Sequence, residues 1–206
     1  MIQQEEVAES SWRWVRISTV ILLIIIAVGI ITISAGFFDP KPIGDLQHTY
    51  QLKPMLVDAE STLTHWLDEP MVDGSGTIRL RAAFDEGEMD SSYGLAIGNS
   101  QDRIIVALSP VGYLTIQRWS DNNGETVETS QILPWQTWPH VRSYNTENEI
   151  WVDFEEGFVT SIRINRELLW QEKIPLKTDQ IGLVAQSFGE QASFNFLSIQ
   201  HYLRQE

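Results

Sequence analysis

The longest apolar run in the chain, residues 17–38, has no charged side chain in 22 positions. As a helix rising about 1.5 Å per residue it would span about 33 Å, slightly more than the ~30 Å hydrocarbon core of a bilayer. A helix buried in a soluble core would show a polar face, and this run shows none. The pattern predicts a transmembrane helix over residues 17–38.

A cleaved signal peptide is the alternative interpretation of this run. Signal peptides carry an apolar region of roughly 7–15 residues followed by a small-x-small cleavage site. Here the run is longer, and Ser34-Ala35-Gly36 followed by two phenylalanines makes a poor site. The chain has no cysteine, which excludes lipoprotein processing. We therefore expect the helix to be retained as a single-pass anchor.

The flanking cations predict the orientation of this anchor. Arg13 and Arg16 directly precede the apolar run, and Lys41 is the only cation shortly after it. By the positive-inside rule, residues 1–16 lie in the cytoplasm and everything from Asp39 onward lies outside it, so that the helix contacts membrane lipid. Two prolines make residues 39–45 a short, stiff linker.

Residues 46–206 show the alternation of apolar and polar positions that is typical of β-strands, with turn residues every eight to twelve positions. Apolar side chains at 78, 80, 82 and 84 give the clearest case. We expect strands over residues 77–85, 92–99, 103–109, 113–119, 127–133, 141–144, 149–155, 158–165, 168–171, 181–187 and 193–199, a corner over 134–139, and about two more strands within 47–66. Eleven to thirteen strands exceed one flat sheet, so the pattern predicts an extracytoplasmic, all-β domain of two packed antiparallel sheets.

Several of these segments, in this order, resemble the laminin-G-like and concanavalin A-like jelly-roll family. The segments are 92–95, 148–152, 164–169, 181–185 and 194–199. The resemblance implies a sandwich of two curved antiparallel sheets over roughly residues 45–204, whose concave face often binds sugars. Arg166 departs from the family pattern by replacing a turn glycine, and Asn195 stands where many members have Asp.

Charge and cysteine content narrow the classes of partner and compartment. Residues 39–206 carry 25 acidic and 12 basic side chains, a formal net charge of −13 that would repel phosphate backbones, so we expect no nucleic-acid binding. Solubility is the simpler reason for this acidity. A cysteine-free domain in an oxidising compartment favours a bacterial or archaeal surface.

Candidate catalytic and metal sites are weak. Retaining glycoside hydrolases of this fold place two Glu around an Asp on one strand, about 5–5.5 Å apart. The nearest segment is 149–155, where Glu149, Trp151, Asp153 and Glu155 share one face but Trp151 stands where a Glu is required. The acidic loop 85–90 and the turn 121–124 lack a calcium-ligand pattern. We expect no catalytic residues, no metal and no cofactor, and the four histidines (His48, His65, His140 and His201) have no metal-ligand spacing.

Six tryptophans lie outside the N-terminal region: Trp66, Trp119, Trp135, Trp138, Trp151 and Trp170. Core packing should account for at least half of them. Trp151 is the best candidate for ligand binding, because its aliphatic strand neighbours indicate that it points away from the core. The alternation leaves Trp119 ambiguous.

These patterns predict a membrane-anchored, non-enzymatic binding module for a glycan or cell-envelope polymer. The alternative is an accessory subunit of a larger membrane protein complex, favoured by the small residues Gly29 and Gly36 in the helix and by the short linker. A third hypothesis is a glycoside hydrolase whose carboxylate pair lies on strands distant in sequence.

Overall fold

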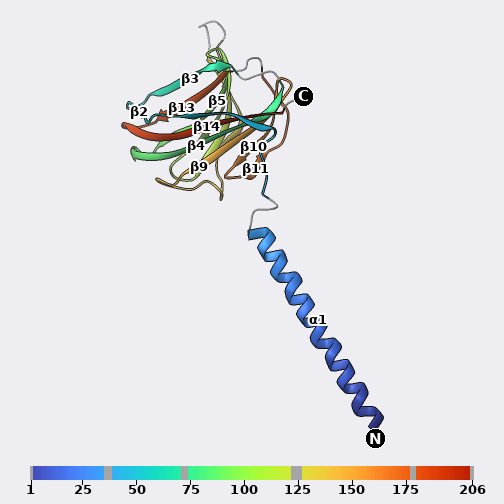
Figure 1. The fold of residues 1–206 in the computed structure, drawn as a ribbon. Helices are drawn as coiled ribbons and strands as arrows, with labels where there is room; N and C mark the ends of the chain where they lie inside the picture. Colours follow the sequence, from blue (N-terminus) through green and yellow to red (C-terminus); the bar gives the residue numbers. More distant parts are fainter. Residues whose placement is uncertain (1, 35–38, 71–73, 122–126, 177–179, 205–206) are drawn as a thin grey trace. The chain divides into compact units, whose positions relative to one another are not determined.

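The computed structural model describes residues 2–34, 39–70, 74–121, 127–176 and 180–204, in two compact units, Met1–Lys41 and Pro42–Glu206. The first unit contains helix α1 (Ile2–Ser34) (Figure 1). Its segment Trp12–Thr32 is long and apolar enough to cross a membrane. A signal sequence near the N-terminus would have the same properties. Residues 35–38 of the predicted span lie outside the described residues.

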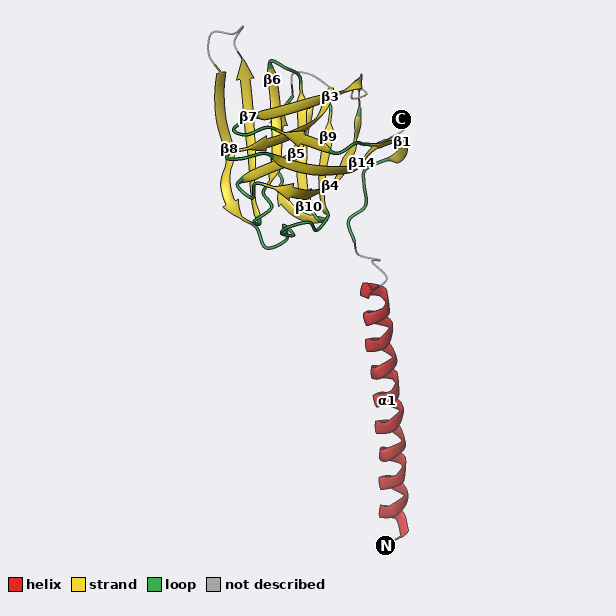
Figure 2. Cartoon of the chain, turned by 90° about the vertical axis from the view of Figure 1, so that its left-hand side faces the viewer, coloured by secondary structure: helices red, strands yellow, loops and turns green. Residues whose placement is uncertain are grey.

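The second unit consists of two antiparallel sheets packed face to face, as predicted (Figure 2). The first sheet has eight strands: β1 (Asp45–Gln51), β14 (Ala192–Leu203), β4 (Ser75–Gly87), β9 (Asn148–Glu155), β10 (Phe158–Ile164) and β11 (Glu167–Trp170) in spatial order, with β12 (Ile174–Pro175) beside β10 and β2 (Met55–Val57) beside β14. The second sheet has six: β3 (Thr62–Pro70), β13 (Gln180–Ser187), β5 (Ser91–Gly98), β6 (Asp102–Leu108), β7 (Tyr113–Asp121) and β8 (Val127–Thr137). We call them the eight-stranded and the six-stranded sheet.

The core lies between the sheets and is built from the alternation that predicted the strands. Ile78, Leu80, Ala82 and Phe84 all point inward from β4, and none is more than 4% exposed. Phe194 of β14 packs against Phe84, with a centroid separation of 6.0 Å. The ring of Tyr93 from the six-stranded sheet lies 5.5 Å from that of Phe194 and joins the two layers.

The segment between β8 and β9 differs from its prediction. Residues 141–144 were expected to form a strand, but the backbone turns here: Val141 N–H donates to Trp138 O and Tyr144 has φ of 57°. Asn148 holds this loop, because its side-chain amide donates to Arg142 O (2.8 Å) and to the buried Tyr93 hydroxyl (2.9 Å). Burial raises the pKa of Tyr93 to about 12, although the hydrogen bond from Asn148 acts in the opposite direction.

Strand β8 continues where a corner was predicted. Pro134 and Trp135 were expected to end the strand, but β8 runs through them to Thr137. The register against β7 shifts twice here, between Leu114 and Ile116 and again between Ile116 and Gln117. Extra residues on β8 therefore form bulges, and at the edge of a sheet a bulge tolerates proline.

The chain enters the sandwich at one end of β4 and β14. Ile43 N–H donates to the hydroxyl of Thr77 (2.7 Å), which donates in turn to the buried carboxylate of Asp153 (2.6 Å). Asp45 is paired with Leu203 at the start of β1. The region 47–66, predicted to hold two strands, contributes to three: β1, β2 and β3.

Candidate functional site

Trp151, the predicted ligand-binding residue, is buried, and the expectation that it is exposed is wrong. Its side chain is only 3% exposed although it does point away from the core. Arg79 and Arg163 are its register partners on the two neighbouring strands, and the Arg79 guanidinium lies 5.2 Å from the indole centroid. The indole N–H donates to Glu149 (2.9 Å). Long arginine stems cover the ring, so Trp151 offers no surface for a ligand.

The other tryptophans divide between packing and an open surface. Trp138 and Trp170 pack against the core. Trp66 lies on Gly182 of the neighbouring strand, since a Cβ on that glycine would come within 2.8 Å of the indole. Trp119 and Trp135 instead line a groove on the outer face of the six-stranded sheet.

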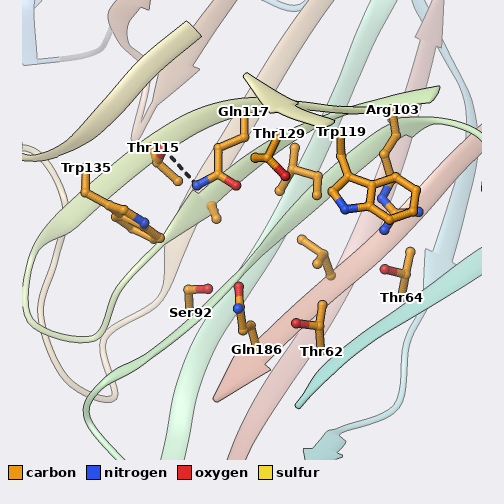
Figure 3. Close-up of a pocket in the computed structure, with 13 residues that line it drawn as sticks. Thr62, Thr64, Ser92, Arg103, Thr115, Gln117, Trp119, Thr129, Trp135 and Gln186 are labelled. Carbon is orange, nitrogen blue, oxygen red and sulfur yellow. Dashed lines mark hydrogen bonds between the residues drawn. The ribbon is translucent and has the colours of Figure 1, made fainter. Parts of the chain in front are cut away.

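This groove has a volume of about 310 Å³, at the lower end of the range for ligand pockets, and crosses all six strands of the sheet (Figure 3). Trp119 and Trp135 lie at its two ends, and hydroxyl and amide side chains lie between them. The thirteen lining residues are Thr62, Thr64, Ser92, Arg103, Ile105, Ala107, Thr115, Gln117, Trp119, Thr129, Trp135, Val184 and Gln186.

Small side chains in one cross-strand row explain why the sheet is hollowed here. The register places Val184, Gly94, Ala107 and Thr115 side by side on four adjacent strands. Gly94 is also required by the backbone, because a Cβ there would lie 1.9 Å from the carbonyl oxygen of Val106. Larger side chains on either side of this row then form the walls.

Each of the two indoles is positioned by its neighbours. Trp119 is paired with Arg103, whose guanidinium carbon lies 3.7 Å from the indole centroid, a close cation–π contact. Trp135 lies in the bulged part of β8 opposite Thr115. A bulge redirects a side chain, which is how a residue next to a proline on an edge strand comes to face the groove.

Hydroxyl and amide groups in the lining suit hydrogen bonding to a hydroxyl-rich ligand. Thr115 donates its hydroxyl proton to Leu133 O (2.8 Å) and accepts weakly from the Gln117 amide (3.4 Å). The Gln117 carbonyl and the Gln186 amide add donors and acceptors that carry no net charge. None of the thirteen lining residues, all within the described part of the chain, is acidic or a histidine.

Two of the carboxylates singled out in the sequence, Asp85 and Glu149, accept hydrogen bonds from side chains of the domain itself. Asp85 accepts from Asn195 (2.9 Å) and Ser193 (3.2 Å), so the asparagine that departs from the family pattern donates where an aspartate would repel. Burial raises the pKa of Glu149, but hydrogen bonds from Arg79 and Trp151 outweigh it and hold that pKa below its ordinary value.

Metal-ligand groups are equally scarce among the residues that the structure describes. No three His, Asp or Glu side chains come together there in a way that could hold an ion. The register does bring His48 opposite His201 across β1 and β14, which the sequence spacing could not indicate. Residues 122–124 of the second acidic turn lie outside the described residues.

The sequence pattern indicated one of the two groove tryptophans, Trp119, but not Trp135. Thr115, Gln117 and Trp119 alternate with Leu114 and Ile116, which places that tryptophan on the outward face of its strand. Nothing in the sequence indicates that four strands would bring small residues together near it. Trp135 was missed because Pro134 made its strand look like a corner.

Comparisons with known proteins identify the fold. No protein-family model matches this chain. No curated protein matches it either.

Solved structures do match. A double-cysteine variant of an alginate lyase, A1-II′, aligns over 73% of this chain and 78% of its own length, with 10% identity and a TM-score of 0.50. A structure described with the endo-acting O-glycanases of prominent human gut microbiota aligns over 74% and 79%, with 8% identity and a TM-score of 0.51. A fructosyltransferase from A. japonicus (10% identity, TM-score 0.47) aligns over 76% of this chain, which spans only 26% of that enzyme. The second unit of this protein thus has the concanavalin A-like sandwich fold, which lectins and glycan-active enzymes share.

Proposed function

We propose that this protein is a membrane-anchored, non-enzymatic module that binds an extended glycan in the groove of the six-stranded sheet. The observation that carries the proposal is the position of two indoles, Trp119 and Trp135, at the ends of a groove lined by hydroxyls and amides. Sugar rings present apolar C–H faces that stack on indoles and hydroxyls that pair with Thr and Gln side chains.

The length of the groove favours a chain of sugars over a single one. Trp119 and Thr115, which faces the bulge carrying Trp135, are four residues apart on β7. At about 3.3 Å per residue they are separated by roughly 13 Å. Two stacking platforms at that distance contact different rings of one oligosaccharide.

The chemistry of the lining favours binding over catalysis. Glycoside hydrolysis uses a pair of carboxyl groups flanking the scissile bond. The described groove residues include no carboxylate, and Arg103 is the one charged side chain among them. The alginate lyase and the O-glycanase structures have this fold and act on glycans by their names, so the fold suits both roles, and the lining supports the binding role.

Helix α1 supplies the anchor in this proposal. Arg13 and Arg16 lie at the N-terminal end of its apolar segment Trp12–Thr32, whereas Lys41 is the only cation shortly after that segment. The cation asymmetry favours a cytoplasmic N-terminus and a binding domain outside. Gly29 and Gly36 leave room for a helix partner, which is the basis of the alternative role as a complex subunit.

Polysaccharide binding by the full-length protein in nanodiscs tests the proposal. Trp119→Ala and Trp135→Ala should each weaken binding at least about tenfold, because each removes a stacking platform. Tyr144→Ala is the matched control: this tyrosine is 64% exposed but does not line the groove, and its loss should leave affinity unchanged.

Three results would argue against this function. Equal binding by the wild type and both tryptophan variants would move the site elsewhere. New reducing ends released from the polysaccharide would make the protein an enzyme. A protein that binds no glycan but migrates in a larger assembly on a native gel would favour the accessory-subunit role.

A further inference from the structure

A second cavity lies beside the Trp135 end of the groove. It measures about 430 Å³ and its walls include three aromatic rings, Tyr113, Trp135 and Phe188, together with Asp90. Trp135 belongs to both cavities, so a ligand in the groove that continues past this indole reaches the second one. We call this second cavity the aromatic cleft.

The rings of the aromatic cleft are available to a ligand. Trp135 and Phe188 meet edge to face, with centroids 6.4 Å apart and an interplanar angle of 85°. Phe188 is 41% exposed and Tyr113 is 42% exposed. Ring faces carry negative electrostatic potential, and several of them around one cavity attract a cation, including quaternary ammonium groups.

Carboxylates around the cleft add to this attraction. Asp90 is part of the wall, and the Glu88 carboxylate lies beside it, where it accepts from the backbone N–H groups of Asp90 and Glu190. These backbone donors lower the pKa of Glu88 and keep it ionised. Three segments meet at this end of the sandwich, residues 54–62, 85–92 and 186–195. They contain no lysine or arginine.

Neither Arg142 nor Arg103 lines the aromatic cleft. Arg142, in the loop before β9, donates to Glu147 O within that same loop. Arg103 lies beside Trp119, at the opposite end of the groove (Figure 3). The groove is therefore polarised, with a positive side chain at the Trp119 end and an acidic, aromatic cavity at the Trp135 end.

We propose that the aromatic cleft binds a positively charged ammonium group, and that the glycan in the groove is one that carries amino groups. The second half of this inference rests on the proposed glycan-binding function, whereas the first does not. Three aromatic rings and a carboxylate in the wall suit a cation, and a neutral sugar would leave that carboxylate without a counterpart. An anionic polymer would meet the net charge of −13 on residues 39–206.

Tetramethylammonium tests the cleft without any sugar. We expect tetramethylammonium chloride, but not equimolar sodium chloride, to change the tryptophan fluorescence of the full-length protein in nanodiscs of neutral lipid. Asp90→Asn and Phe188→Leu should abolish this change. Glu86→Gln removes the same charge from an exposed neighbour outside the cleft and should preserve it. The same change in the wild type and in Asp90→Asn would overturn the cation site.

A matched pair of oligosaccharides tests the glycan class. Chitosan and chitin oligomers of one length share a backbone and differ in whether the nitrogen is charged. Chitosan should bind about tenfold more tightly, and Asp90→Asn should remove this preference while Trp119→Ala weakens both ligands. Equal affinities in the wild type would refute an amino-bearing ligand and leave the groove intact. Binding of neither oligomer, with tetramethylammonium still bound, would refute the glycan in the groove and retain the cation site.

Discussion

Glu149 links three residues on the outer face of the eight-stranded sheet. Its carboxylate accepts from the Arg79 guanidinium and from the Trp151 indole, and Arg166 lies 3.9 Å away. The side chains of Arg79 and Glu149 are only 19% and 13% exposed. An ion pair so shielded is costly to break, because the remaining partner keeps an unpaired charge.

Glu149 should make the domain sensitive to acid. Its pKa is lower in the folded state than in the unfolded chain, where a Glu titrates near 4.3. The stabilisation is therefore present above that value and is lost as pH falls through the lower, folded pKa. Glu149→Gln should reduce the free energy of unfolding at pH 7 by about 1–3 kcal/mol and flatten its decline below pH 4.3. Urea titrations across this pH range provide the measurement.

Glu155→Gln is the control, since Glu155 lies on the same face of β9 but is exposed. Its replacement should change the free energy of unfolding by only a few tenths of a kcal/mol. An equally large loss from both variants would show that net charge, and not the Glu149 contacts, determines the acid response.

The hairpin between β10 and β11 has a strained two-residue turn. Asn165 and Arg166 connect the two strands, and both have positive φ, 52° and 75°. Such two-residue hairpins favour Asn followed by Gly, because a Cβ is unfavourable in the left-handed region. Asn165 also donates to His140 O (2.6 Å) and accepts from Glu149 N–H (2.8 Å). These hydrogen bonds hold the hairpin in place despite the left-handed conformation of Arg166.

Arg166→Gly should stabilise the domain. Relief of the left-handed conformation should raise the free energy of unfolding by about 0.5–1 kcal/mol, less the small value of an exposed ion pair to Glu149. Thermal unfolding of the full-length protein in nanodiscs would measure the change. Arg166→Ala loses the same ion pair without relieving the backbone, so it should not stabilise, and equal gains in both variants would contradict this explanation.

Prediction from the sequence succeeded for elements with regular alternation and failed where backbone hydrogen bonding was irregular. β4 was predicted over 77–85 and spans Ser75–Gly87, with the expected face buried. β8 was ended at residue 133, since a proline in a strand is a turn signal until the strand is known to be an edge. Residues 141–144 were expected to form a strand, but the side chain of Asn148 donates a hydrogen bond to the carbonyl of Arg142 and holds the segment as a loop.

Across the whole domain, the connection to the helix and the aromatic cleft lie at opposite ends of the sandwich. Ile43 is bound to Thr77 near the start of β4, whereas Asp90 follows the end of that thirteen-residue strand. At about 3.3 Å per residue the two ends are separated by roughly 40 Å. Within the domain, Ile43 and Asp90 therefore lie at opposite ends of β4.

The membrane topology of the chain can be tested directly. Protease added to intact cells should digest the domain, and the mature chain should retain residues 1–16, because Arg13 and Arg16 keep the N-terminus inside. Mass spectrometry of the purified protein gives the N-terminus. A chain that begins near Gly36 would show a cleaved signal peptide, and a domain protected until the membrane is breached would reverse the orientation. A cytoplasmic protein that remains undigested in the same cells serves as the control for intact membranes.

The alternation within most strands, the two-layer architecture and the apolar helix follow from the sequence alone, because these depend on the order of polar and apolar residues along the chain. Which tryptophans a ligand can reach depends instead on the tertiary structure. Trp151 points outward yet is covered by Arg79, and Trp135 follows a proline yet faces the groove. Exposure depends on side chains that neighbouring strands supply from distant positions, and strand register, set by bulges and turns, brings them together.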